Sequence, residues 1–140
     1  MDKENTKAPA VVEPPGNKSV KPGAVSVLPL LYDFILWFSG KINAFPKKFK
    51  FTLGDRITVT QLDILEQLIE ARFNRKRREH YLRQANVNIE KLRYLVRLSK
   101  DLQCMSLKEY EHAARKLQEI GSMVGGWEKY SKEKEDGEEV

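Results

Sequence analysis

The sequence predicts an all-α protein folded as an antiparallel four-helix bundle with up-down-up-down topology. Apolar residues recur every three or four positions in four separate segments, and no segment alternates apolar and polar residues as a half-buried strand would. The connections between these segments are short, which places consecutive helices side by side in opposite directions. About a hundred of the 140 residues share this pattern, enough for one domain with a single core.

The two ends of the chain lack the helical pattern. Residues 1–26 combine four prolines with Gly, Lys and Glu and contain few large apolar residues, so burial would not offset the entropy cost of ordering them. We therefore expect a disordered Pro-rich leader over residues 1–26 and the bundle over residues 27–130. Residues 131–140 are expected to form a disordered acidic tail.

The first helix is expected over roughly residues 28–44 and carries more apolar surface than one face requires. Pro46 ends it, because a residue that precedes proline avoids helical backbone angles. The apolar run is too short for a membrane span and contains Asp33. Its surplus apolar residues are candidates for a contact between subunits: Leu30, Leu36 and Trp37.

The other three helices follow from similar patterns. The second begins near Thr52, whose hydroxyl can cap the following amides, and carries Ile57, Leu62, Leu65, Leu68, Ile69 and Phe73. The third has the most regular seam, formed by Leu82, Ala85, Ile89, Leu92, Val96 and Ser99. The fourth opens with a capping box of Ser106 and Glu109, and its seam is Leu107, Tyr110, Ala114, Leu117, Gly121 and Val124. Gly125 and Gly126 in this helix suggest a bend or a close backbone approach.

Catalysis and metal binding find little support in the sequence. Glu109 and His112 have the Glu-x-x-His spacing of di-iron bundles, but a second copy is missing and His112 is expected to face solvent. His80 has no ligand at metal-site spacing, and no local pattern ties a histidine to Cys104. We expect no enzyme, no metal and no cofactor.

A single cysteine also gives no sign of an oxidising compartment, so the expected location is the cytoplasm, without a membrane anchor.

Positive charge is concentrated in the middle of the chain. The formal net charge is +5, but residues 41–100 contain 15 Lys and Arg against 6 Asp and Glu, which gives +9. One basic cluster precedes the second helix and another follows it, so they lie at opposite ends of the bundle, and the polar face of the third helix connects them. A phosphodiester backbone can follow such a line, whereas a small anion cannot. The candidate nucleic-acid contacts are Lys47, Lys48, Lys50, Arg72, Arg75, Lys76, Arg77, Arg78, Arg83, Arg93, Arg97 and Lys100.

An ordinary solvated surface is the alternative explanation for these charges. In the first cluster, FPKKFKF, the phenylalanines are expected to fasten the turn to the end of the bundle while the lysines face a partner.

Four segments, FPKKFKFTLGDRI, EARF, EKLRYLVRLSKDL and KLQEIGSMVGGW, occur in an order and spacing that resemble the accessory variability determinant (Avd) proteins of diversity-generating retroelements. The resemblance covers roughly residues 30–130. It implies a basic four-helix bundle that assembles as a ring-like homopentamer. It further implies a non-catalytic accessory protein that binds the reverse transcriptase of the same element, its template-repeat RNA and possibly the cDNA, enabling mutagenic cDNA synthesis.

Two other functions stay open at this point. The bundle proteins encoded in intervening sequences of ribosomal RNA genes share the fold and an FPK-like turn, and they would bind RNA. Their Leu-Thr-rich stretch and Glu-Gly-Phe element are replaced here by TLGDRITVTQLDILEQLIEA, which favours the retroelement family. The third possibility is a structural adaptor ring for protein partners, favoured by the apolar excess of the first helix and by the acidic tail.

Overall fold

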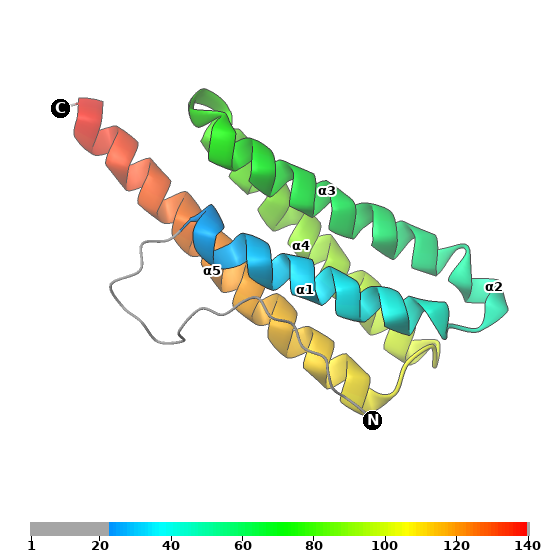
Figure 1. Ribbon diagram of the computed structural model, residues 1–140. Coiled ribbons are helices and arrows are strands. Elements are labelled where there is room, and N and C mark those ends of the chain that lie inside the picture. The colour runs from blue at the N-terminus through cyan, green and yellow to red at the C-terminus, as the bar shows by residue number, and fades with distance from the viewer. Residues whose placement is uncertain (1–22, 140) are drawn as a thin grey trace.

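The computed structural model describes residues 23–139, which contain helices and no strand (Figure 1). Four long helices make up the bundle: α1 (Ala24–Asn43), α3 (Leu53–Phe73), α4 (Arg78–Asp101) and α5 (Leu107–Glu139). Two short elements lie in the connections, the four-residue helix α2 (Lys47–Lys50) and the 3-10 helix η1 (Arg75–Arg77). None of the helices in this range combines the length and the apolar character needed to cross a membrane.

Successive long helices run in opposite directions, as the up-down-up-down topology requires (Figure 1). α1 and α4 each pack on both α3 and α5, so the order around the bundle is α1, α3, α4, α5. The α1–α3 and α4–α5 connections lie at one end of the bundle, and the turn that contains η1 lies at the other (Figure 1). We call these the α2 end and the η1 end.

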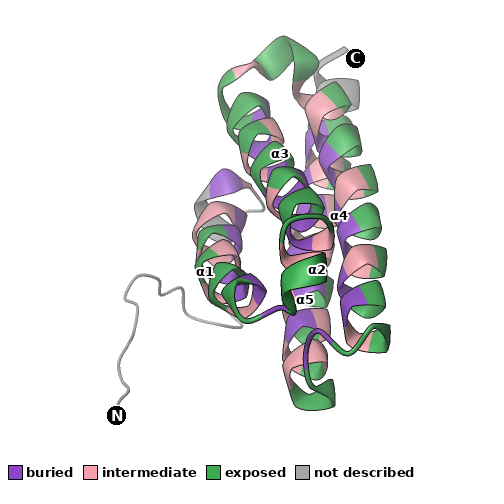
Figure 2. Cartoon of the chain, turned by 90° about the vertical axis from the view of Figure 1, so that its right-hand side faces the viewer, coloured by how far each residue is buried: buried purple, intermediate pink, exposed green. Residues whose placement is uncertain are grey.

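The core follows the inward faces of the four helices. Figure 2 views the bundle from the α2 end, with buried residues turned inward and exposed residues outside. α4 agrees with the sequence pattern in full, since Leu82, Ala85, Ile89, Leu92, Val96 and Ser99 are all buried. The hydroxyl of Ser99 donates a 2.9 Å hydrogen bond to the carbonyl oxygen of Leu95, so its burial leaves no unpaired donor.

The buried face of α5 differs from the predicted seam. Its buried residues are Ala113, Leu117, Ile120, Val124, Trp127 and Ser131. Leu107 is exposed, while Tyr110, Ala114 and Gly121 are half-buried. Two series of residues with helical spacing run along this segment, and the series that contains Ile120 and Trp127 buries the larger apolar area.

α3 also buries a different set from the one predicted. Ile57 and Leu68 are buried as expected, together with Gly54, Thr60, Gln61, Ile64 and Ala71. Leu62, Ile69 and Phe73 were expected on the apolar face, but their side chains are exposed. α3 therefore presents apolar residues on the side that faces away from its own core.

Helix boundaries differ from the prediction at both ends of the bundle. α1 begins at Ala24, and the remainder of the predicted leader, residues 1–22, lies outside the described residues. α5 continues to Glu139 through the segment expected to be a disordered tail. Lys and Glu are good helix formers, and Ser131 at the start of this segment is buried.

A close approach between α3 and α1 occurs at Gly54, whereas Gly125 and Gly126 have open space beside them. A Cβ atom added at either of the latter would have nothing within 4 Å. At Gly54 it would lie 2.7 Å from Cγ2 of Ile42 and 3.6 Å from the carbonyl oxygen of Phe49. Only glycine therefore lets the start of α3 sit this close to α1.

We predict that Gly54→Ala lowers the free energy of unfolding by roughly 1–3 kcal/mol, because Ile42 must move to accept the methyl group. Gly40→Ala is the matched control, since a Cβ atom there meets nothing within 4 Å. Alanine at that helical position should stabilise the protein by about 0.5–1 kcal/mol. Urea denaturation of both variants checks this, and equal stabilisation by both would contradict the close approach.

Candidate nucleic-acid interface

Three lysines project from the α2 end. The carbonyl oxygen of Pro46 accepts hydrogen bonds from the amides of Phe49 and Lys50, both at 2.9 Å, which winds the segment into one short helical turn. Lys47 and Lys48 are exposed, and Lys50 is half-buried. None of the three forms an ion pair with a carboxylate whose side chain the structure describes, so their charges are open to a partner.

The phenylalanines of this end have different roles. Phe45 is buried and makes an edge-to-face contact with Phe38 at a centroid distance of 6.4 Å, while Phe49 packs against the core. Phe51 was expected to fasten the turn, but its side chain is 62% exposed. Nζ of Lys50 lies 5.7 Å from the Phe51 ring. An exposed ring beside an ammonium group can stack on a nucleic-acid base while the cation contacts phosphate.

At the η1 end, one of five clustered cations has a structural role. Nε of Arg78 donates a 2.6 Å hydrogen bond to the carbonyl oxygen of Ala71, and Nη2 donates to that of Arg72 at 2.9 Å. Arg78 thus satisfies carbonyl groups that the last turn of α3 leaves without helical partners. The exposed cations of this end are Arg72, Arg75, Lys76 and Arg77.

The η1 end repeats the combination of cation and exposed aromatic ring found at the α2 end. The guanidinium group of Arg72 lies 5.1 Å from the ring of Phe73, whose side chain is 75% exposed. The guanidinium group of Arg77 lies 5.6 Å from the ring of Tyr81. Both ends of α3 therefore offer a ring for stacking and a cation for phosphate.

Each basic end adjoins the N-terminus of a long helix that no side chain caps. Thr52 precedes α3 but does not cap it as predicted, because its hydroxyl donates to the carbonyl oxygen of Lys48 at 3.1 Å. Arg77 precedes α4 and offers no capping oxygen. Uncapped amides and the positive end of the helix dipole attract phosphate groups. The start of α5, by contrast, is occupied by Ser106 and Glu109.

The polar face of α4 is not the continuous basic line that the sequence suggested, because Arg93 is bound within the bundle. Its Nη1 donates to Oε1 of Gln118 at 3.1 Å, and its Nη2 donates to the carbonyl oxygen of Leu117 at 3.5 Å. Its Nε also lies 3.7 Å from the Glu90 carboxylate. Arg93 therefore joins α4 to α5.

Two further cations of α4 are paired with one carboxylate. Asp101 lies 4.0 Å from Nε of Arg97 and 3.2 Å from Nζ of Lys100. Arg83, in contrast, is exposed and has no ion-pair partner among the described residues. The structure thus presents two separate basic ends, about 31 Å apart along the 21 residues of α3.

The predicted subunit-contact residues of α1 are only partly exposed. Leu30 and Trp37 are half-buried and pack against the core of their own chain. Leu36 is 60% exposed. Of the three, Leu36 is the one whose side chain is open to a second subunit.

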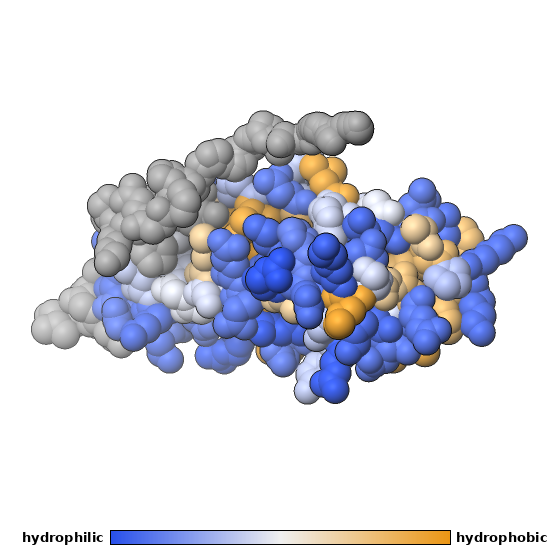
Figure 3. All heavy atoms as spheres, turned by 90° about the horizontal axis from the view of Figure 1, so that it is seen from below, coloured by the Kyte–Doolittle hydropathy of each residue, from blue (hydrophilic) through white to orange (hydrophobic). Residues whose placement is uncertain are grey.

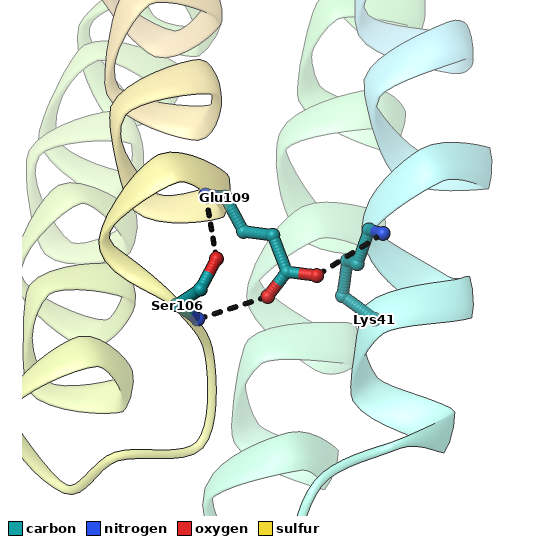
Figure 4. Close-up of polar contacts among 3 residues, drawn as sticks. All are labelled: Lys41, Ser106 and Glu109. Atoms are coloured by element: carbon teal, nitrogen blue, oxygen red, sulfur yellow. Dashed lines mark hydrogen bonds and ion pairs between the residues drawn. The ribbon is translucent and has the colours of Figure 1, made fainter.

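Glu109 and His112 have separate structural roles. Glu109 accepts a 2.9 Å hydrogen bond from the amide of Ser106, whose hydroxyl accepts one from the Glu109 amide at 3.0 Å, which confirms the predicted capping box (Figure 4). Glu109 also pairs with Lys41 at 3.3 Å. His112 was expected to face solvent, but the register of α5 turns it toward α1, where its ring lies 4.5 Å from that of Trp37. Residues 23–139 contain no group of three or more potential metal ligands.

Hydrogen bonds, nearby charges and burial shift the pKa values of Glu109, His112 and Cys104. The Ser106 amide and the ammonium group of Lys41 lower the pKa of Glu109. Burial lowers the pKa of His112, and nearby cations lower it further. Cys104 is buried in the α4–α5 connection, where burial raises the pKa of its thiol and so reduces the fraction of reactive thiolate.

Comparison with known protein families matches residues 27–131, about three quarters of the chain, to the bAvd-like family. The match spans most of the bundle and includes both basic ends. No curated protein and no solved structure matched the chain.

We predict that Arg78 contributes to the stability of the fold, whereas Arg77 contributes to RNA binding. Arg78→Gln should lower the free energy of unfolding by roughly 1–3 kcal/mol, because the carbonyl groups at the end of α3 lose charged hydrogen bonds. Arg77→Gln should leave stability nearly unchanged and weaken binding of a single-stranded RNA. Urea denaturation and filter binding on both variants check this, and equal loss of stability in the two would contradict the roles assigned to them.

A second prediction concerns the pH dependence of the capping box. Because the pKa of Glu109 is lowered in the folded state, its stabilisation is complete above the ordinary carboxyl range and is lost as the pH falls through the lowered value. Glu109→Gln should lower the free energy of unfolding by roughly 0.5–1 kcal/mol at neutral pH, a modest figure because the carboxylate is partly exposed. Denaturation curves from neutral to strongly acidic pH should converge for the two proteins, and a constant difference would contradict the assignment.

Proposed function

Because the chain belongs to the bAvd-like family, we propose that it is a non-catalytic accessory subunit of a diversity-generating retroelement. In this proposal it binds the reverse transcriptase of the element and its template RNA, and so enables mutagenic cDNA synthesis. The protein contributes binding and positioning, while the polymerase carries out the chemistry.

The observation that carries the RNA-binding part is the composition of the two basic ends. Each end combines cations that have no carboxylate partner in the described chain, an exposed phenylalanine, and a helix N-terminus without a side-chain cap. The cations concerned are Lys47, Lys48 and Lys50 at the α2 end, and Arg72, Lys76 and Arg77 at the η1 end. A solvated surface would account for the charges, but it gives no reason for exposed aromatic rings beside them at both ends.

The separation of the two ends favours a polymer over a small ligand. About 31 Å of α3 lies between them, and the cations along α4 are largely paired within the chain. A single phosphate or nucleotide can contact one end only. A folded RNA can contact both, releasing counterions at each contact.

The proposal includes self-association, with a ring-like homopentamer as the form implied by the family resemblance. Exposed apolar side chains on several helices support it, among them Leu36 on α1 and Leu62 on α3. In water such surfaces are stabilised when a second chain covers them.

The test of the RNA-binding part is the triple variant Lys47→Glu, Lys48→Glu, Lys50→Glu. We predict weaker RNA binding and a flatter salt dependence. Each lost phosphate contact should reduce the slope of log K against log salt by about 0.7–0.9, or by about 2–3 for all three. Fluorescence anisotropy with a labelled RNA over a salt series measures both quantities.

The matched control reverses three exposed lysines of α5 at Lys108, Lys129 and Lys132. It changes the net charge by the same amount, so it should reduce affinity much less than the first triple variant. Equal losses in the two triple variants would show that net charge alone governs binding. RNA binding that does not respond to salt, or no binding by the wild type, would contradict the proposed function.

A further inference from the structure

The outer face of α3 carries apolar residues flanked by unpaired carboxylates. Val59, Leu62 and Ile69 are exposed on this face. Asp55, Asp63, Glu66 and Glu70 lie beside them, are exposed, and form no ion pair with any residue of the described chain. A face that is both apolar and acidic fits a partner surface that is apolar and basic.

The outer face of α4 has that complementary composition. Val87, Tyr94 and Leu98 are exposed on the side of α4 opposite its buried seam. Arg83 and Lys91 lie along the same side, are exposed, and have no carboxylate partner among the side chains that the structure describes. The outer faces of α3 and α4 are therefore both apolar and carry charges of opposite sign.

The other two long helices offer less apolar surface. Tyr32 and Leu36 are the exposed large apolar residues among the described side chains of α1, and Leu107 is the one on α5. Figure 3 views the molecule from the side on which α5 lies, and this face is largely hydrophilic with apolar residues in small separate groups. The unpartnered apolar surface is therefore concentrated on α3 and α4.

The two outer faces also match in height along the bundle. Nδ2 of Asn88 on α4 donates a 3.0 Å hydrogen bond to Oε1 of Gln67 on α3, which fixes the level of one helix against the other. Counting outward from this bond along antiparallel helices, the following pairs lie at the same height to within about one helical turn. The apolar pairs are Ile69 with Val87, Leu62 with Tyr94, and Val59 with Leu98; the charged pairs are Asp63 with Lys91 and Glu70 with Arg83.

We propose that the outer face of α3 in one copy of this chain packs against the outer face of α4 in the next copy. Two different faces meet, so the contact is heterologous and repeats from copy to copy. Because the matching pairs lie at equal heights, neighbouring copies are related by rotation without a shift along the bundle axis. Such a contact closes into a ring instead of extending into a helical filament.

The arrangement of the bundle suits a ring of four or five copies. α3 and α4 occupy adjacent corners of the bundle, so their outward directions differ by roughly 90°. A closed ring of four or five copies needs contact directions that differ by about 90° or 108°. This interface deepens the self-association part of the proposed function and rests on it for the expectation that copies of the chain meet.

Charge reversal at one pair tests the interface. Lys91→Glu places a carboxylate opposite Asp63 of the neighbouring copy, and Asp63→Lys places an ammonium group opposite Lys91. Each single variant should reduce the mass measured by sedimentation velocity from a multiple of 16.2 kDa toward that of one chain. The double variant Asp63→Lys, Lys91→Glu restores opposite charges across every contact and should recover the wild-type mass. Lys108→Glu, with the same charge change on α5, should leave the mass unchanged.

Disulfide trapping tests the geometry without disturbing charge. The double variant Ile69→Cys, Val87→Cys should give, after mild oxidation, a ladder of covalent oligomers that ends at the ring, since each link joins two different faces. Either cysteine alone should give no linked species, and the buried Cys104 stays unreacted. A dimer from a single-cysteine variant, single charge variants with wild-type mass, or a double charge variant without recovery would overturn the proposed interface.

Measuring RNA affinity on the same wild-type preparation separates this inference from the proposed function. A monomeric wild type that binds RNA would overturn the interface and leave the RNA-binding role in place. A ring that fails to bind RNA would support the interface and contradict the role.

Discussion

Burial of the α4 seam is the constraint on which the rest of the structure depends. α4 packs on both α3 and α5, and its inward residues, Leu82 through Ser99, are buried along nearly the whole helix. This burial orients the 24 residues of α4 and holds the two ends of the bundle roughly 36 Å apart. It also turns Val87, Tyr94 and Leu98 outward, because they lie on the opposite side of the same helix.

The cations of the chain divide into two groups according to their neighbours. Along α4, Arg93 joins α4 to α5, and Asp101 at the end of the helix neutralises Arg97 and Lys100. Around α2 and η1, by contrast, Lys50 and Arg72 lie beside the exposed rings of Phe51 and Phe73. A ring whose symmetry axis runs parallel to the bundle axis would gather all α2 ends on one rim and all η1 ends on the other. Several weak contacts on one rim would then act together on a single RNA, which raises its apparent affinity.

Helical periodicity was sufficient to predict the four helices, their antiparallel order, the α4 seam and the capping box of α5. It could not predict which apolar stripe of α3 is buried, because Leu62, Ile69 and Phe73 have helical spacing whether the core or another chain covers them. The partners of Arg93 could not be predicted either, because Gln118 lies 25 residues further along the chain and is brought near only by folding. The exposure of Phe51 was missed because an aromatic residue beside a turn is more often buried.

The central claim is that this chain brings RNA and a polymerase together as an accessory subunit, and the most direct measurement is affinity purification of the tagged protein from its native host. The purification is carried out with and without nuclease, and the co-purifying proteins and RNA are identified. The account predicts a reverse transcriptase together with one discrete non-ribosomal RNA. Recovery of ribosomal RNA alone, or of protein partners other than a reverse transcriptase that are retained equally after nuclease treatment, would contradict it.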